Sequence, residues 1–161
     1  MQIDEELIAI IDKLKVVENK EARELYKLIN ENSLSYDLTN RLLNYFDKVE
    51  DFEAKIKFLG YLLKLNEEPE IYSILGHTYK KLKDFSNAKY YYDKAILLDP
   101  TNFIYYYNKG IILYEEENYE DALNCFIESS LCNKNVDLVF YNLGNTYSKL
   151  GNHLNAIKCY K

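Results

Sequence analysis

The stretch YSILGHTYKKLKDFSNAKYYYDKAILLDP, residues 72–100, decides the fold of this chain. Large and small residues in its first half stand three, four and seven positions apart, the spacing of one helix face: they are Tyr72, Leu75, Gly76 and Tyr79. Its second half has the same spacing, and Pro100 ends it because proline cannot continue a helical hydrogen-bond ladder. The stretch therefore predicts two helices joined by a short turn.

This pattern returns at a constant interval of 34 residues, as positions 54, 88, 122 and 156 show. Small and bulky positions recur in phase: Ala54, Ala88, Ala122 and Ala156; Phe58, Tyr92, Phe126 and Tyr160; Gly76, Gly110 and Gly144. Polar residues that suit helix N-caps recur as Asp84, Asn118 and Asn152, and Pro69 suits the first position of a helix. We expect a tandem array of helical hairpins in which the glycines and alanines let the two helices of a hairpin approach closely.

The pattern of aromatic, Leu-Gly, Tyr, Ala, aromatic, Ala and Pro resembles the tetratricopeptide repeat. The resemblance implies an all-α fold, a right-handed α-solenoid of tandem antiparallel helix–turn–helix repeats, that serves as a protein-interaction module. It assigns repeats to residues 69–102 and 103–136 and a truncated repeat to residues 137–161. Residues 35–68 form a degenerate repeat with Leu42 at the glycine position and with Asp51 and Phe52 displaced by one residue. Residues 1–34 are predicted to be an N-terminal helical pair, either a cap or a decayed repeat.

The charge and hydropathy of the chain argue against nucleic acid and membranes as partners. A net charge of -6 and a pI near 5.0 oppose binding to nucleic acid. No apolar run reaches the ~20 residues of a membrane-spanning helix, and the acidic N-terminus is not a signal peptide. We expect a soluble, cytoplasmic protein with no membrane or nucleic-acid contact. The chain has an odd number of cysteines, Cys125, Cys132 and Cys159. They fit a packing role better than a disulfide framework or a zinc site.

The sequence offers little material for catalysis. It contains none of the common phosphate-binding, dinucleotide-binding, zinc-protease or hydrolase motifs. The two histidines, His77 and His153, are not expected to be neighbours, and the run from Glu115 to Glu117 is interpreted as a solvated helix end. We therefore predict that the chain is not an enzyme and needs no cofactor or metal.

The family resemblance also implies a binding site on the first helices of successive repeats, which line a concave groove. Asn108 and Asn142 occupy the place of an asparagine that bonds a bound peptide, and the alternative is that they tie adjacent repeats together. Helical geometry adds further groove residues, giving the set Ser73, His77, Tyr107, Asn108, Ile111, Leu138, Tyr141, Asn142 and Asn145. Cochaperone members of the family hold a carboxylate-ended peptide with lysines, arginine and asparagines, and only Asn108 agrees with that set.

Two functions remain open at this stage. The first is an adaptor that binds a peptide or protein segment in the groove. The alternative is self-assembly into a homo-oligomer through the C-terminal end, where Ala156, Ile157 and Tyr160 form an apolar face with no capping helix after it. Most of the 17 tyrosines occupy packing positions. The repeat pattern does not explain all of Tyr105, Tyr107, Tyr114, Tyr141 and the cluster Tyr90 to Tyr92, and some of these should be partly exposed.

Overall fold

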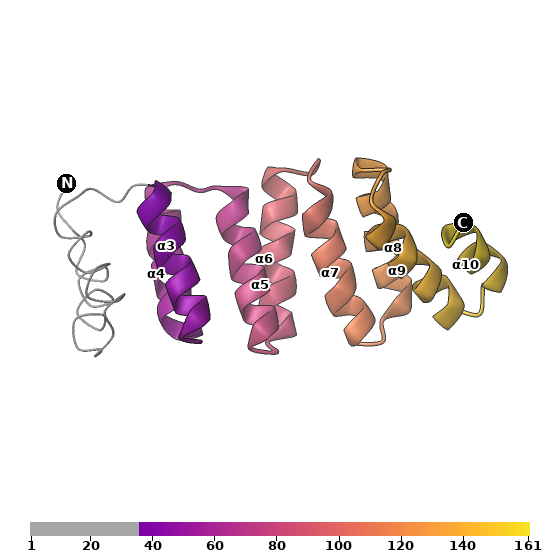
Figure 1. Cartoon of the computed structure of the whole chain (residues 1–161), viewed down its shortest axis with the longest axis horizontal. Helices are drawn as coiled ribbons and strands as arrows, with labels where there is room; N and C mark the ends of the chain where they lie inside the picture. The colour runs from indigo at the N-terminus through magenta and orange to yellow at the C-terminus, as the bar shows by residue number, and fades with distance from the viewer. Residues whose placement is uncertain (1–35) are drawn as a thin grey trace. The chain divides into compact units, whose positions relative to one another are not determined.

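The structure, a computed structural model, describes residues 36–161, and every regular element in that range is an α-helix (Figure 1). The chain divides into two compact units, residues 1–67 and 68–161. The first unit contains α3 (Tyr36–Lys48) and α4 (Phe52–Leu65). The second contains α5 (Pro69–Lys81), α6 (Phe85–Leu98), α7 (Phe103–Glu115), α8 (Tyr119–Cys132), α9 (Asp137–Lys149) and α10 (His153–Cys159). The helical pair predicted at residues 1–34 lies outside the described residues.

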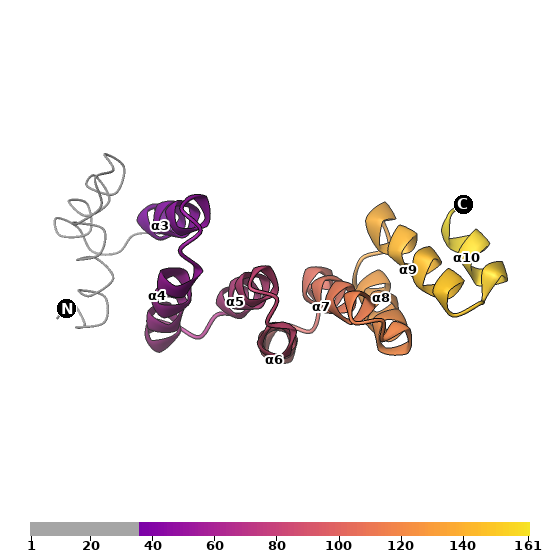
Figure 2. The ribbon, with the colours of Figure 1, turned by 90° about the horizontal axis from the view of Figure 1, so that it is seen from below.

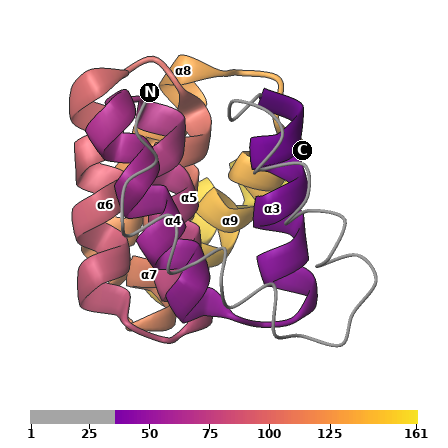
Figure 3. The ribbon, with the colours of Figure 1, turned by 90° about the vertical axis from the view of Figure 1, so that its left-hand side faces the viewer.

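In the second unit each helix packs on its neighbours in sequence. Helices α5 and α6, α7 and α8, and α9 and α10 form three hairpins, and α6 also contacts α7 as α8 contacts α9 (Figure 2). Figure 3 views the chain from its N-terminal side, where α5 and α6 of this unit run side by side. The predicted all-α solenoid of helical hairpins is therefore confirmed.

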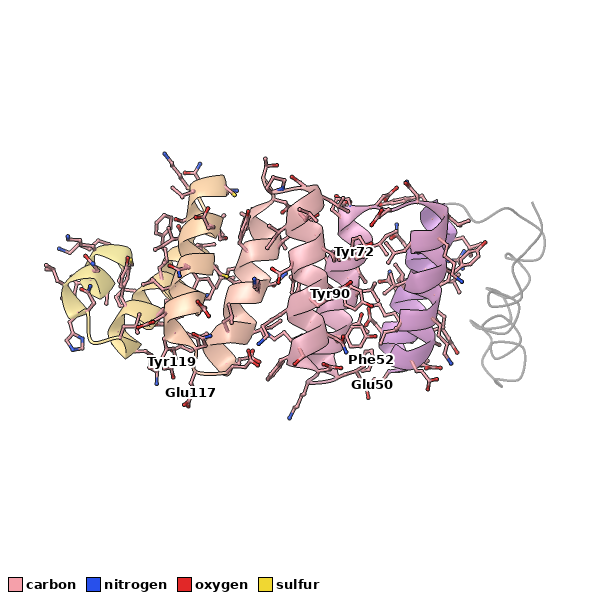
Figure 4. The ribbon with its side chains drawn as sticks, turned by 180° about the vertical axis from the view of Figure 1, so that it is seen from behind. Glu50, Phe52, Tyr72, Tyr90, Glu117 and Tyr119 are labelled. Atoms are coloured by element: carbon pink, nitrogen blue, oxygen red, sulfur yellow. The ribbon has the colours of Figure 1, made fainter. Side chains whose placement is uncertain are left out.

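The predicted N-caps are also confirmed. The side chains of Asp84, Asn118 and Asn152 each accept a hydrogen bond from a backbone N–H three residues later. These bonds satisfy amides that the first turn of a helix leaves without a partner. The residue before each cap has a positive φ, 59° at Lys83, 61° at Glu117 and 75° at Gly151. Figure 4 labels Glu117 in the turn between α7 and α8.

The three glycines of the repeat pattern face aromatic rings of the second helix in the same hairpin. A Cβ atom at Gly110 would lie 2.8 Å from Cε1 of Phe126, and one at Gly76 would lie 3.0 Å from Cδ2 of Tyr92. The predicted close approach is therefore a contact between a glycine backbone and a ring, which fills the space a side chain would need. The three pairs are Gly76 with Tyr92, Gly110 with Phe126, and Gly144 with Tyr160.

Successive hairpins share buried side chains. One buried cluster joins α7, α8 and α9 through Leu113, Ala122, Phe126, Val139 and Leu143. A second joins α6 and α7 through Ala88, Tyr92 and Ile112. The alanines and rings of one hairpin are thus covered by the first helix of the next, which is how a repeat stack buries surface that a single hairpin leaves exposed.

The register of α4 differs from that of α6. The N-cap of α4 is Asp51, which confirms the predicted displacement. Ala54 is buried as Ala88 is, but it is the third residue of its helix, whereas Ala88 is the fourth. The fourth place of α4 belongs to Lys55, which is also buried and whose Nζ lies 2.6 Å from Oδ2 of Asp47. The loop after α4, residues 66–68, is shorter than the loop after α6, residues 99–102. The repeat interval therefore places Ala54 one helix position earlier than Ala88.

The contact between glycine and ring predicts opposite effects of one substitution at two sites. Gly110→Ala should lower the free energy of unfolding by about 1–3 kcal/mol, because the new methyl group overlaps Phe126. Gly60→Ala in α4 is the matched control, since no atom lies within 4 Å of its Cβ position. It should raise stability by up to about 1 kcal/mol through helix propensity. Chemical denaturation measures both, and equal effects would contradict the packing described.

Tyr92 has a buried hydroxyl without a hydrogen-bond partner in the described part of the chain. The side chain is 0% exposed, and burial raises its pKa above the ordinary value of 10.0. The corresponding residue of the next hairpin is Phe126, which lacks the hydroxyl and is equally buried. The ring alone therefore fills this position, and the Tyr92 hydroxyl adds a desolvation cost.

We expect Tyr92→Phe to raise the free energy of unfolding by about 1 kcal/mol at neutral pH. Above pH 10 the unfolded chain loses the tyrosine proton while the folded chain retains it, so stability falls as pH rises through that range. The variant should show a weaker loss of stability above pH 10. Thermal unfolding between pH 7 and pH 11 tests this, and a variant less stable than the parent at pH 7 would refute it.

Candidate functional site

The candidate binding face is the set of nine residues predicted from the sequence, and it lies on α5, α7 and α9. Pairs four residues apart on one helix share a face, as Tyr107 and Ile111 do on α7 and Tyr141 and Asn145 on α9. None of the nine is buried; Leu138 is 54% and Tyr141 57% exposed. All nine side chains therefore keep access to solvent. The set is Ser73, His77, Tyr107, Asn108, Ile111, Leu138, Tyr141, Asn142 and Asn145.

Asn142 links two helices of this face. Its Nδ2 donates to Oη of Tyr107 at 3.2 Å and to the backbone oxygen of Leu138 at 2.9 Å. The bond to Tyr107 joins α9 to α7, so Asn142 has the tying role that the sequence left open. The side chain of Asn108 makes no hydrogen bond with any residue in the range 36–161. The two asparagines thus differ, although they occupy the same place in their repeats.

The C-terminal end of the face is held by Tyr160. Its Oη donates to Oδ1 of Asn145 at 2.7 Å, and its ring centroid lies 6.1 Å from that of Tyr141. The same ring faces Gly144. The contact between glycine and ring inside the last hairpin therefore also orients two residues of the candidate binding face.

Lysines near the face are paired with acids across repeats. Lys80 Nζ lies 2.8 Å from Oε1 of Glu115, and Lys109 Nζ lies 2.5 Å from Oδ1 of Asp93. Glu116 pairs with Lys89 of α6. The acidic run at the end of α7 is exposed, as predicted, but two of its members also join neighbouring hairpins. The stacking of α5 and α6 against α7 brings these opposite charges together, which the linear sequence does not show.

A tyrosine cluster on α5 and α6 was not predicted. The ring of Tyr91 stacks on that of Tyr79, with centroids 5.3 Å apart, and on that of Tyr72, with centroids 6.2 Å apart. The ring of Tyr90 meets that of Tyr91 edge-on. Figure 4 labels Tyr72 and Tyr90 on these two helices. Burial and the neighbouring Tyr79 raise the pKa of Tyr91. The repeat gave no signal for the cluster, because the next repeat has a cysteine, Cys125, at the same place.

The other unexplained tyrosines divide by burial. Tyr105 is buried, Tyr107 and Tyr114 are half-buried, and Tyr141 is 57% exposed. Exposed aromatic rings are frequent contact residues at protein interfaces. Of these four, Tyr141 is therefore the one whose exposure suits a contact with a partner.

The described residues contain no group of three or more His, Cys, Asp or Glu that could hold a metal ion. His77 and His153 belong to hairpins that have another hairpin between them. Cys125, Cys132 and Cys159 are free thiols, and burial raises the pKa of Cys125 to about 11. Between residues 36 and 161, no helix is both long and apolar enough to cross a bilayer.

Family models of the tetratricopeptide repeat match residues 69–102, 91–124 and 139–161. The chain belongs to the tetratricopeptide repeat family. As such it is a protein–protein interaction module. The first match covers α5 and α6, the second runs from α6 through α7 into α8, and the third covers most of α9 with α10. No curated protein matches the sequence.

Solved structures with this fold include that of MamA, which is 16% identical with a TM-score of 0.74 and covers 99% of this chain and 92% of that one. The N-terminal domain of stress-induced protein-1 from C. elegans is 26% identical, with a TM-score of 0.54, over 56% of this chain and 77% of that one. The tetratricopeptide domain of Arabidopsis OM64 is 22% identical, with a TM-score of 0.55, over 58% and 77%. These likenesses establish the fold.

A double-mutant cycle tests the link between α7 and α9. Tyr107→Phe and Asn142→Ala should each lower the free energy of unfolding by about 0.5–1.5 kcal/mol, because each removes one partner of the same hydrogen bond. The double variant should lose less than the sum of the two changes. Asn108→Ala is the control and should change stability by less than about 0.5 kcal/mol. Strict additivity would contradict a link through this bond.

Proposed function

We propose that the candidate binding face holds an extended peptide segment of a partner protein. The observation that carries this proposal is the contrast between the two equivalent asparagines. Asn142 is bonded within the stack, whereas Asn108 has a half-buried amide without a hydrogen bond in the described range. A partly desolvated amide next to exposed apolar side chains suits a peptide backbone, which supplies both a donor and an acceptor.

Asn142 and Asn145 support the same reading. The bonds of Asn142 use its Nδ2 and leave Oδ1 as an acceptor, while Asn145 uses Oδ1 and leaves Nδ2 as a donor. Tyr141, which precedes Asn142 on α9, adds an exposed ring, and this ring contributes contact area at modest entropic cost. Three amides on two helices thus offer bonds of both kinds, as an extended backbone requires.

Isothermal titration against peptides selected from a random library tests this proposal. The double change Asn108→Ala with Asn142→Ala should weaken binding by roughly ten- to thirtyfold, because two hydrogen bonds of about 1 kcal/mol are lost. Asn124→Ala on α8 is the control, since this exposed asparagine lies on a second helix away from the face. Affinities unchanged in the double variant would show that the segment binds elsewhere.

A second candidate is self-association through α10. The exposed fractions of Ile157 and Tyr160 are 54% and 49%, whereas Phe126, the equivalent of Tyr160 in the preceding hairpin, is 0% exposed. Phe126 is covered by α9 in the buried cluster described above. A helix from a second copy that packed on α10 in the same way would bury this apolar surface.

Sedimentation at several protein concentrations tests the second candidate. The parent chain should form dimers as concentration rises, and Ile157→Glu should shift it towards the monomer, because a charge would enter the apolar contact. Leu97→Glu on α6 is the control, with a 75% exposed leucine distant from α10. A monomer at all concentrations would rule this candidate out.

A further inference from the structure

Building on the proposed function, we infer that the segment held by the candidate binding face is uncharged and anchors aliphatic or aromatic side chains on Ile104 and Leu138. Ile104 was not predicted as a site residue. It is the second residue of α7, as Leu138 is the second residue of α9, and the two occupy the same place in successive repeats. Their exposed fractions are 43% and 54%. Each helix therefore presents an exposed apolar side chain at the same place.

These anchors lie beside the amides of the face. Leu138 provides the backbone oxygen that accepts from Nδ2 of Asn142, and Tyr141 follows it by less than one turn. Ile104 stands one turn before Asn108 on α7. An extended segment bonded to the amides can therefore place alternate side chains on the apolar residues. In such binding, the backbone hydrogen bonds give affinity and the contacts of the side chains give specificity.

The charges of this region argue against an acidic segment. The ammonium groups of Lys80 and Lys109 are occupied by Glu115 and Asp93. The residue of α5 that corresponds to Ile104 and Leu138 is Glu70, which adds a negative charge. A carboxylate on the segment would have to displace an existing ion pair, and one near α5 would face Glu70 as a like charge. Neutral apolar side chains meet no such cost.

The test uses three sets of fluorescein-labelled twelve-residue peptides, acetylated and amidated at their ends, with the full chain as receptor. One set alternates Leu or Phe with Ser, and in the other two sets Glu or Lys replaces the Leu and Phe. Fluorescence anisotropy should show the tightest binding for the apolar set. Its Kd should change less than about twofold between 50 and 500 mM NaCl, because no ion pair forms.

Matched variants locate the anchors. Leu138→Asp should weaken binding of the apolar set at least tenfold, and Ile104→Asp should act in the same direction, since each removes apolar contact area. Leu131→Asp is the control: this leucine is 62% exposed on α8 and should leave the Kd within about twofold. Circular dichroism of each variant verifies that the helices are retained.

The outcomes separate this inference from the function on which it rests. Tighter binding of the Glu set, weakened by salt and by Asn108→Ala with Asn142→Ala, would overturn the inference and leave the proposed function intact. No binding of the apolar set would overturn the inference as well. Binding of the apolar set that neither Leu138→Asp nor the double asparagine variant weakens would overturn both.

Discussion

The fold of the second unit depends on one contact, in which an aromatic ring of the second helix of each hairpin lies against a glycine of the first. A methyl group at Gly110 would approach Phe126 to 2.8 Å, so the ring occupies the volume of a missing side chain. Glycine inside a helix costs about 1 kcal/mol relative to alanine. The ring offsets that cost through close packing, and the next hairpin then covers it in a shared buried cluster. The hairpins α5–α6 and α7–α8 are thereby both packed internally and shaped for the hairpin that follows.

This contact also sets the candidate binding face. The ring that opposes Gly110 also lies beside the face: the ring centroid of Phe126 is 5.9 Å from that of Tyr107, and Tyr107 and Ile111 pack on its cluster while staying partly exposed. In the last hairpin Tyr160 lies in the equivalent place, since its ring faces Gly144 and lies beside Tyr141, and its hydroxyl bonds Asn145. The hydrogen bond between Asn142 and Tyr107 then joins neighbouring repeats. Packing and the proposed recognition thus share residues, and ion pairs such as Lys80 with Glu115 occupy the cations that an acidic ligand would need.

The features that recur at the repeat interval could be predicted from the sequence. Helix positions, the caps at Asp84, Asn118 and Asn152, and the pairing of small with bulky residues all follow from periodicity, which reports packing directly. Periodicity gave no warning of the buried Lys55, because the register shifts at α4, where the following loop is shorter. Features made by stacking left no signal either: the tyrosine cluster around Tyr91, and the ion pairs that join separate hairpins. Ile104 was not in the predicted set, although Leu138 at the equivalent place of the next repeat was, and its 43% exposure appears only in the structure. The binding role of the face remains a proposal.

The coupling between Gly110 and Phe126 tests the central claim most directly. Phe126→Leu shortens the side chain that opposes the glycine, so it should make room for the methyl group of Gly110→Ala. Urea denaturation of the two single variants and the double variant gives their interaction energy. The account predicts that Gly110→Ala costs at least about 1 kcal/mol less in the Phe126→Leu background than in the parent. Equal costs in both backgrounds, within about 0.5 kcal/mol, would mean that the ring does not determine the need for glycine.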